Sequence, residues 1–209
     1  MTRNSSDPNF LLVSPTPHKY VIHLLLFDLR AKAEWCYESR GWKAVLKVLL
    51  TDGTPAMIWY RLMQWARRWR LVPLEMLFNR INTICCGCII GRGAEFGPGF
   101  VLIHSIGVVI NGNVRGGSGV KIEHQVTIGA EKRQSPVIGN NVFIGAGAKV
   151  IGTLLIGDGA KVGANAVVLK DVPAGSTVVG IPAKVIRLGD RKTSDEEEAK
   201  IPEIPDNGI

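Results

Sequence analysis

The stretch that decides the fold runs from Ile138 to Val168 and reads IGNNVFIGAGAKVIGTLLIGDGAKVGANAVV. Within it an aliphatic residue returns at every sixth position, at Ile138, Ile144, Val150, Ile156, Val162 and Val168. This period is neither the 3.6 of an amphipathic helix nor the 2 of an alternating strand, so it indicates a repeat architecture. Short parallel strands joined by tight corners can wind into a triangular prism with these aliphatics pointing inward. The pattern therefore predicts a parallel β-helix.

The same period extends towards the amino terminus in two further runs. One run is Ile90, Phe96, Leu102 and Val108, and the other, displaced by two residues, is Ile110, Gly116, Ile122 and Ile128. The displacement at Val108–Val109 and the break from Ala130 to Pro136 interrupt the repeat. The second interruption must leave the prism as a loop, and loops are where a solenoid places functional residues.

Before about residue 88 the apolar residues have helical spacing. Four helices are expected, over 28–37, 42–50, 55–70 and 73–84. In the third, Ile58, Leu62, Trp65 and Trp69 form an apolar stripe, and Arg61 is among the arginines on the remaining, charged surface. Such a helix suits packing against its neighbours with solvated or paired arginines, and it also suits a membrane surface.

The change of period divides the chain. The sequence predicts an N-terminal extension over 1–26, a helical domain over 27–88, a β-helix domain over 89–188 and a disordered tail over 189–209. The fold class is thus α+β, with the helical domain preceding the solenoid.

Composition sets limits on the function. The 209 residues include 46% hydrophobic residues, which excludes wholesale disorder, and a net charge of +7, which favours an anionic partner. No apolar stretch in the first half is long enough to span a bilayer, and the amino terminus lacks the order of an export signal, so a cytoplasmic location is expected. Cys85, Cys86 and Cys88 lack a fourth ligand at suitable spacing, so buried thiols are favoured over a metal site.

Two histidines are candidates for chemistry. Acyl transfer to a hydroxyl needs a base near the acceptor oxygen, and histidine is suited to that role near neutral pH. His104 and His124 each precede one of the two interruptions and occupy the third position of a hexad, so both are expected to project from a prism face. Both are interpreted as catalytic residues. The alternative is that each caps a strand edge or bonds a backbone carbonyl.

Six stretches of the sequence, in both the helical and the repeat region, resemble the serine acetyltransferase family of hexapeptide acyltransferases. The matching residues are 60–65, 90–93, 102–110, 126–129, 144–152 and 178–183. The resemblance implies a left-handed parallel β-helix, acetyl-CoA as co-substrate, and a homotrimer whose pairing into hexamers stays open. No metal is expected, because the solenoid has two histidines and a zinc site made of histidines needs three. It also implies that His104 is the general base, and that the pantetheine groove and the phosphate end are marked by Gly129, Ala146, Gly147, Ala164 and Lys184.

The sequence also departs from the family. Ile89 stands where the family has an aspartate that orients the base, Ile103 replaces an aspartate before the histidine, and Gln134 with Ser135 replaces an arginine-histidine pair. These polar groups would bind a zwitterionic amino acid, so the acceptor stays open between L-serine in cysteine biosynthesis and a sugar or exopolysaccharide hydroxyl. The carboxylate for His104 is sought at Glu123, at Glu131 or on a neighbouring subunit.

A non-catalytic hypothesis remains as the alternative to the enzymatic one. In it the histidines are structural, and the chain is a hexapeptide scaffold that docks on a partner or a membrane through its basic third helix. Nucleic acid is not expected as a partner, and peripheral membrane contact is not favoured. Loss of acetyl transfer on substitution of His104 separates the two readings.

Overall fold

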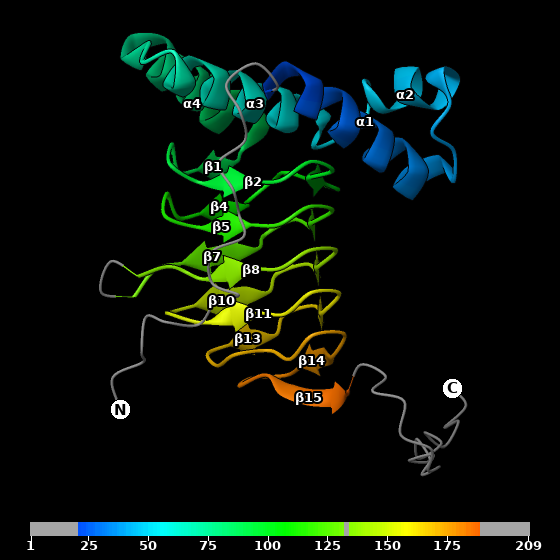
Figure 1. Cartoon of the computed structure of the whole chain (residues 1–209), viewed down its shortest axis with the longest axis vertical. Helices are drawn as coiled ribbons and strands as arrows, with labels where there is room; N and C mark the ends of the chain where they lie inside the picture. Colours follow the sequence, from blue (N-terminus) through cyan, green and yellow to red (C-terminus); the bar gives the residue numbers. More distant parts are fainter. Residues whose placement is uncertain (1–20, 132–133, 189–209) are drawn as a thin grey trace, which may run out of the picture.

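The computed structural model describes residues 21–131 and 134–188, and most of the expected extension and the whole expected tail lie outside the described residues. Four helices in this part of the chain precede a stack of short strands (Figure 1). They are α1 (Val21–Tyr37), α2 (Trp42–Val48), α3 (Thr54–Arg68) and α4 (Val72–Cys86). None of the described helices is long and apolar enough to cross a membrane.

Helix α1 begins at Val21, before the helix start expected at residue 28 and the domain start expected at residue 27. Leu24 is buried, and it continues the face that also buries Asp28 and Lys32. These positions are four residues apart, which places them on one side of a helix. Because two of the three carry charge, the hydrophobic pattern does not reveal this face.

The strands wind around three faces. They are β1 (Ile89–Ile90), β2 (Glu95–Phe96), β3 (Val101–Leu102), β4 (Val109–Ile110), β5 (Arg115–Gly116), β6 (Lys121–Ile122), β7 (Thr127–Gly129), β8 (Val137–Ile138), β9 (Phe143–Ile144), β10 (Lys149–Ile151), β11 (Leu155–Ile156), β12 (Lys161–Val162), β13 (Val167–Val168), β14 (Thr177–Val179) and β15 (Lys184–Arg187).

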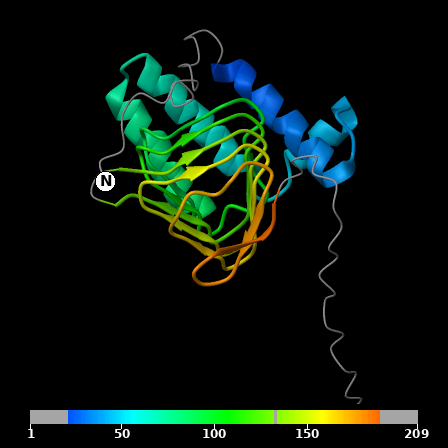
Figure 2. The same cartoon turned by 60° about the horizontal axis from the view of Figure 1, so that its bottom comes forward.

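Each face is a stack of parallel strands. We call them face A (β1-β4-β7-β10-β13), face B (β2-β5-β8-β11) and face C (β3-β6-β9-β12-β14). Viewed from nearer its lower end, the stack encloses a triangular cross-section (Figure 2). Strand β15 pairs antiparallel with β14 and ends the prism. From β1 to β13 consecutive strands belong to consecutive faces, so every third strand returns to the same face one coil lower. In the last coil, face B has only a bridge between Ile156 and Val172 before β14 returns to face C.

The six-residue aliphatics fill the interior as the sequence predicts. Those of the third run are at most 2% exposed. Gly116 breaks the pattern because the Phe96 ring from the coil above fills its place. A Cβ on Gly116 would lie 2.2 Å from Cδ1 of Phe96, and this ring stacks on Phe100 with centroids 4.4 Å apart. One aromatic side chain thus replaces an aliphatic side chain of the next coil.

The helical segment caps the open edge of the first coil. In the lower coils a strand carbonyl accepts a hydrogen bond from the coil above, as Ile122 O does from Ile103 N at 2.9 Å. The first coil has no coil above it, so its carbonyls need other donors. Side chains supply them at 2.7–3.3 Å: Asn79 to Ile90 O, Tyr60 to Ala94 O, Arg61 to Phe96 O and Gly97 O, and Lys32 to Leu102 O and Ile103 O.

This capping role corrects the expectation for the third helix. The buried residues of α3 include Met57, Tyr60 and Met63, whereas Trp69 of the expected apolar stripe is 62% exposed. Arg61, expected on the charged surface, is buried, and its Nε donates to Asp28 Oδ2 at 2.6 Å. The physical reason is that α3 packs on the open edge of the first coil, where strand carbonyls lack backbone donors. The inner face of α3 therefore needs hydrogen-bond donors as well as apolar side chains.

Candidate active site

His104 and His124 occupy equivalent positions on the prism, one coil apart. Leu102 of β3 is in register with Ile122 of β6, so the residues two further along meet at the same corner, between faces C and A. The ring centroids lie 5.9 Å apart with the planes at 76°. The side chains are 51% and 45% exposed. Both imidazoles therefore face outward, as their hexad position predicts.

The corner that carries His104 is wider than the corner below it. Residues 103–108 connect β3 to β4, whereas the shorter segment 123–126 connects β6 to β7. The extra residues are the displacement seen in the sequence. Ser105 Oγ donates to Cys86 O at 3.0 Å, which ties this corner to the end of α4. The first interruption is thus part of the candidate site itself.

A carboxylate from the helical segment contacts His104. The Oδ2 atom of Asp52, in the loop between α2 and α3, lies 3.3 Å from Nδ1 of His104. With Nδ1 protonated and donating to this carboxylate, the other ring nitrogen, Nε2, holds a lone pair and can accept a proton. Among the described residues no hydrogen bond to Nε2 is present, so that nitrogen is open to a substrate.

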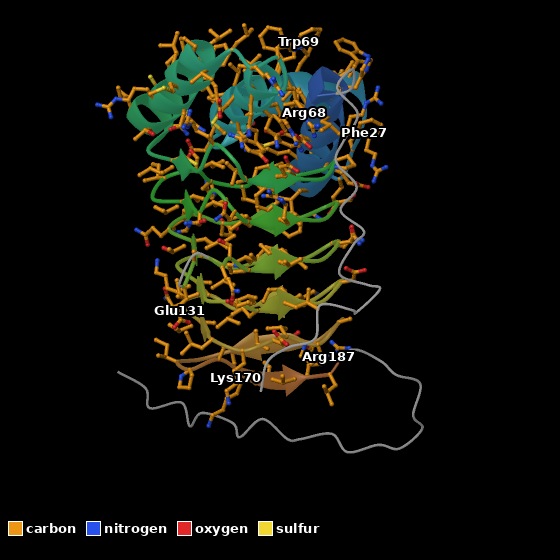
Figure 3. All side chains as sticks on the ribbon, turned by 60° about the vertical axis from the view of Figure 1, so that its left-hand side comes forward. Phe27, Arg68, Trp69, Glu131, Lys170 and Arg187 are labelled. Atoms are coloured by element: carbon orange, nitrogen blue, oxygen red, sulfur yellow. The ribbon has the colours of Figure 1, made fainter. Side chains whose placement is uncertain are left out.

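The carboxylates considered from the sequence lie elsewhere. Glu123 Oε2 is 3.6 Å from Nδ1 of His124, the second histidine. Glu131 lies in the loop that leaves the prism after β7, at the far end of face A from the histidine corner, and it projects from the side of the prism in Figure 3. The carboxylate that the structure brings to His104 is Asp52, which was not among the candidates.

Part of the predicted groove continues the histidine corner downwards. The strand register carries the position of His124 on to Ala146 and Ala164 in the two coils below. Gly147 N donates to His124 O at 2.9 Å, and Asn165 N donates to Ala146 O at 2.8 Å. Gly147 has φ +71°, and a Cβ there would meet the Asn165 side chain. We call His104, His124, Ala146 and Ala164 the corner column.

Two predicted residues lie at the margins of this column. Gly129 ends β7, at the opposite edge of face A from His124, so the structure does not bring it beside the histidines. Lys184 begins β15 and pairs with Val179, next to the residue that follows Ala164 in the column. Lys184 is exposed at the lower end of the prism, where Figure 3 also shows Lys170 and Arg187.

The clustered cysteines lie where the helices meet the prism. Cys86 and Cys88 are buried, while Cys85 is exposed. Burial raises the pKa of the Cys88 thiol to about 12, so this group stays protonated near neutral pH. Within 21–131 and 134–188, no three histidine, cysteine or acidic side chains come together as a set that could hold a metal ion.

Sequence reasoning missed Asp52 and Lys32. The Asp52-Gly53 pair reads as a turn signal, and its contact with a residue 52 positions later leaves no local trace. Lys32 is fully buried, yet in the sequence it is one of many basic residues. Nothing in the period of either region marks these two side chains, because both act across the junction between the regions.

Comparison with known proteins gives a consistent result. A family model described as bacterial transferase hexapeptide (six repeats) matches residues 135–170. The serine acetyltransferase of Helicobacter pylori is 40% identical over 143 residues, which cover 66% of this chain and 84% of that protein.

Solved structures agree with the sequence relatives. A Brucella abortus serine acetyltransferase in complex with coenzyme A superposes with a TM-score of 0.73 at 28% identity, covering 82% of this chain and 70% of that one. A Neisseria gonorrhoeae serine acetyltransferase in complex with serine gives a TM-score of 0.73 at 31% identity, covering 79% and 69%. The expected fold, a helical segment followed by a left-handed parallel β-helix, is confirmed. The chain belongs to the serine acetyltransferase family of hexapeptide-repeat acyltransferases.

Proposed function

We propose that the protein is an acetyl-CoA-dependent O-acetyltransferase in which His104 is the general base. The observation that carries this proposal is a half-exposed imidazole at a prism corner whose Nδ1 contacts the carboxylate of Asp52, which leaves Nε2 as the nitrogen available to a substrate. A base held in one tautomer beside an open surface suits proton transfer from an acceptor hydroxyl. Family membership supplies the acyl-transfer chemistry.

The reaction follows from this arrangement. Nε2 of His104 takes the hydroxyl proton as the acceptor oxygen attacks the thioester carbonyl of acetyl-CoA. The tetrahedral intermediate then collapses and its carbon–sulfur bond breaks. The leaving thiolate receives the proton from the imidazolium, which gives the O-acetyl ester and free coenzyme A. In this proposal His124, whose ring centroid lies 5.9 Å from that of His104, donates a hydrogen bond to the developing oxyanion.

The corner column supports a path for the coenzyme. Ala146 and Ala164 have small side chains, so an extended pantetheine arm can approach the backbone along the column. From His104, at the level of β3, to Lys184 on β15 the path crosses five strand intervals, about 24 Å at the usual strand spacing. The thioester would then lie by the histidines and the phosphates near Lys184. Gly129 borders the same face from its other edge.

L-serine is the first candidate acceptor, because the relatives of this chain are serine acetyltransferases. A sugar or exopolysaccharide hydroxyl is the second candidate. It is favoured by Ile89 and Ile103, which stand where the resemblance implies aspartates, and Ile103 is only 8% exposed. Isoleucines cannot bind an ammonium group, so the amino acid would need other partners.

A homotrimer fits the site as a further part of the proposal. The prism faces are flat and repetitive, which favours packing side by side about a threefold axis. A neighbouring prism beside the corner column would enclose the coenzyme and complete the acceptor site. Light scattering on the full chain measures this assembly, and a monomer with full activity would contradict it.

A thiol-release assay tests the proposed function. Purified protein with acetyl-CoA is offered L-serine and a panel of neutral sugars, and free coenzyme A is measured. We expect release with one of the two classes, and a loss of about 10²- to 10⁴-fold in His104→Ala. Full activity in a folded His104→Ala protein, or no binding of coenzyme A by the wild type, would favour the scaffold reading.

A further inference from the structure

The helical segment contributes more than a cap to the prism, because its α2–α3 loop reaches the active corner. Gly53 is buried with φ +75°, and a Cβ there would lie only 2.4 Å from the carbonyl oxygen of Leu102. An alanine at this position would separate the loop from the end of β3. The close approach holds the neighbouring residue, Asp52, within reach of His104.

Lys32 bridges the two segments that carry these side chains. Its ammonium is fully buried and donates to the carbonyl oxygens of Asp52, Leu102 and Ile103. Leu102 and Ile103 directly precede His104. An ammonium has three donors and no acceptor, so three carbonyls match it completely. One cation therefore ties the loop to the strand end from which His104 projects.

The other caps of the first coil lack this second connection. Asn79 donates to Ile90 O at 2.7 Å on face A, where it satisfies a strand carbonyl as Lys32 does on face C. Neither Asn79 nor Arg61 contacts Asp52 or the histidines through a hydrogen bond in the described residues. The cap at Lys32 is thus the one that meets a catalytic corner, and simple edge capping does not require its bond to Asp52.

We propose that Asp52 is the carboxylate that orients His104, and that Lys32 is a positioning residue that fixes Asp52 against the strand end. The proposal rests on the proposed function, and it makes the helical segment part of the active site. It also accounts for Ile89, because a carboxylate delivered from the α2–α3 loop removes the need for one on β1.

The first test compares acidic residues of the same segment. Asp52→Asn is expected to lower kcat by about 10- to 100-fold with little change in the KM for acetyl-CoA, since the base loses its orientation and not its coenzyme site. Glu38→Gln, which changes an exposed carboxylate between α1 and α2 and outside the α2–α3 loop, is the matched control and should keep wild-type kcat. Equal kcat in wild type and Asp52→Asn would overturn the proposal.

Chemical rescue gives a readout that a purely structural role would not produce. Asp52 is 63% exposed at its side chain, so Asp52→Ala leaves a gap that a small carboxylate can enter. Added formate is expected to raise the kcat of Asp52→Ala in a saturable manner, without effect on Glu38→Gln. An absence of rescue at any formate concentration, with the variant folded, would count against orientation by a carboxylate.

The role of Lys32 on face C is tested by comparison with Asn79, which caps face A. Lys32→Met and Asn79→Leu each remove a cap and should each lower the melting temperature. At a temperature where both remain folded, Lys32→Met should also lose kcat about tenfold or more, whereas Asn79→Leu should keep it. Equal kcat in the two variants would assign Lys32 to edge capping alone. An inactive wild-type protein would instead refute the proposed function, so the two failures are distinguishable.

Discussion

The prism and the helical segment solve the same physical problem in opposite ways. In the prism each coil satisfies the backbone of the next, so the interior can be aliphatic and the sequence can repeat. The helical segment meets a coil whose carbonyls have no such partner, and it answers with side-chain donors from Lys32, Arg61 and Asn79. The difference teaches that the sequence period predicts the structure of a solenoid only as far as its last coil. Where it ends, single polar side chains decide the structure.

The largest effect is expected at the buried ion pair of the cap. Arg61→Met leaves Asp28 buried without its cation and frees the carbonyls of Phe96 and Gly97, which should lower the free energy of unfolding by about 3–5 kcal/mol. Denaturant unfolding followed by tryptophan fluorescence measures the change. Arg40→Met removes the partner of the exposed Glu34 and is the control, for which no measurable change is expected. Equal effects of the two variants would contradict the capping account.

A smaller effect is expected inside the prism, where shape replaces charge. Gly116→Ala places a Cβ against the Phe96 ring and should destabilise the protein by about 1–3 kcal/mol. Gly112→Ala is the matched control, because its Cβ would approach no atom closer than 3.6 Å. Thermal unfolding of the two variants is compared at one pH. If Gly116→Ala leaves the stability unchanged, the ring of Phe96 does not fill the space that an aliphatic side chain at residue 116 would occupy.

The corner column is tested by the same substitution at two corners. Ala164→Leu adds a side chain in the proposed coenzyme path and should raise the KM for acetyl-CoA roughly tenfold. Ala174, two residues after Val172, is likewise exposed, but at a corner after face B, so Ala174→Leu should leave this KM unchanged. Steady-state kinetics at saturating acceptor separates them. Equal KM values would remove the column as the coenzyme path.

The pH dependence of stability reports on Lys32. Burial lowers its pKa from the ordinary 10.5 to about 8, while Cys36, Asp52 and Glu123 nearby oppose that shift. Between these values the unfolded chain binds a proton that the folded protein does not, so the contribution of this group to stability rises with pH. It is fully present above 10.5 and is lost as the pH falls through 8.

The corresponding measurement is a difference between variants. The free energy of unfolding of wild type, minus that of Lys32→Met, should increase between pH 8 and pH 10. Asn79→Leu removes an uncharged cap and should give a difference that does not change over this range. A flat difference for Lys32→Met would mean that the ammonium is not buried as the structure has it.

The extent to which the sequence predicted the molecule follows from this contrast. The six-residue period predicts three features of the molecule. They are the prism, the loop between β7 and β8, and the outward position of His104 and His124. The inner face of α3 could not be predicted, because Arg61 on it binds Asp28 and a carbonyl of a distant coil. The start of α1 could not be predicted either, because its buried face carries the charged residues Asp28 and Lys32. Asp52 was missed because no local pattern records a contact across the junction.

The central claim is that His104 of the prism and Asp52 of the helical segment act as one unit. A double-mutant cycle in the thiol-release assay tests it most directly, using Asp52→Asn, His104→Ala and the double variant. If Asp52 acts through the imidazole, Asp52→Asn lowers kcat in the wild-type background but costs nothing further once His104 is alanine. If the two losses multiply, the carboxylate acts independently of the histidine, and the account is wrong.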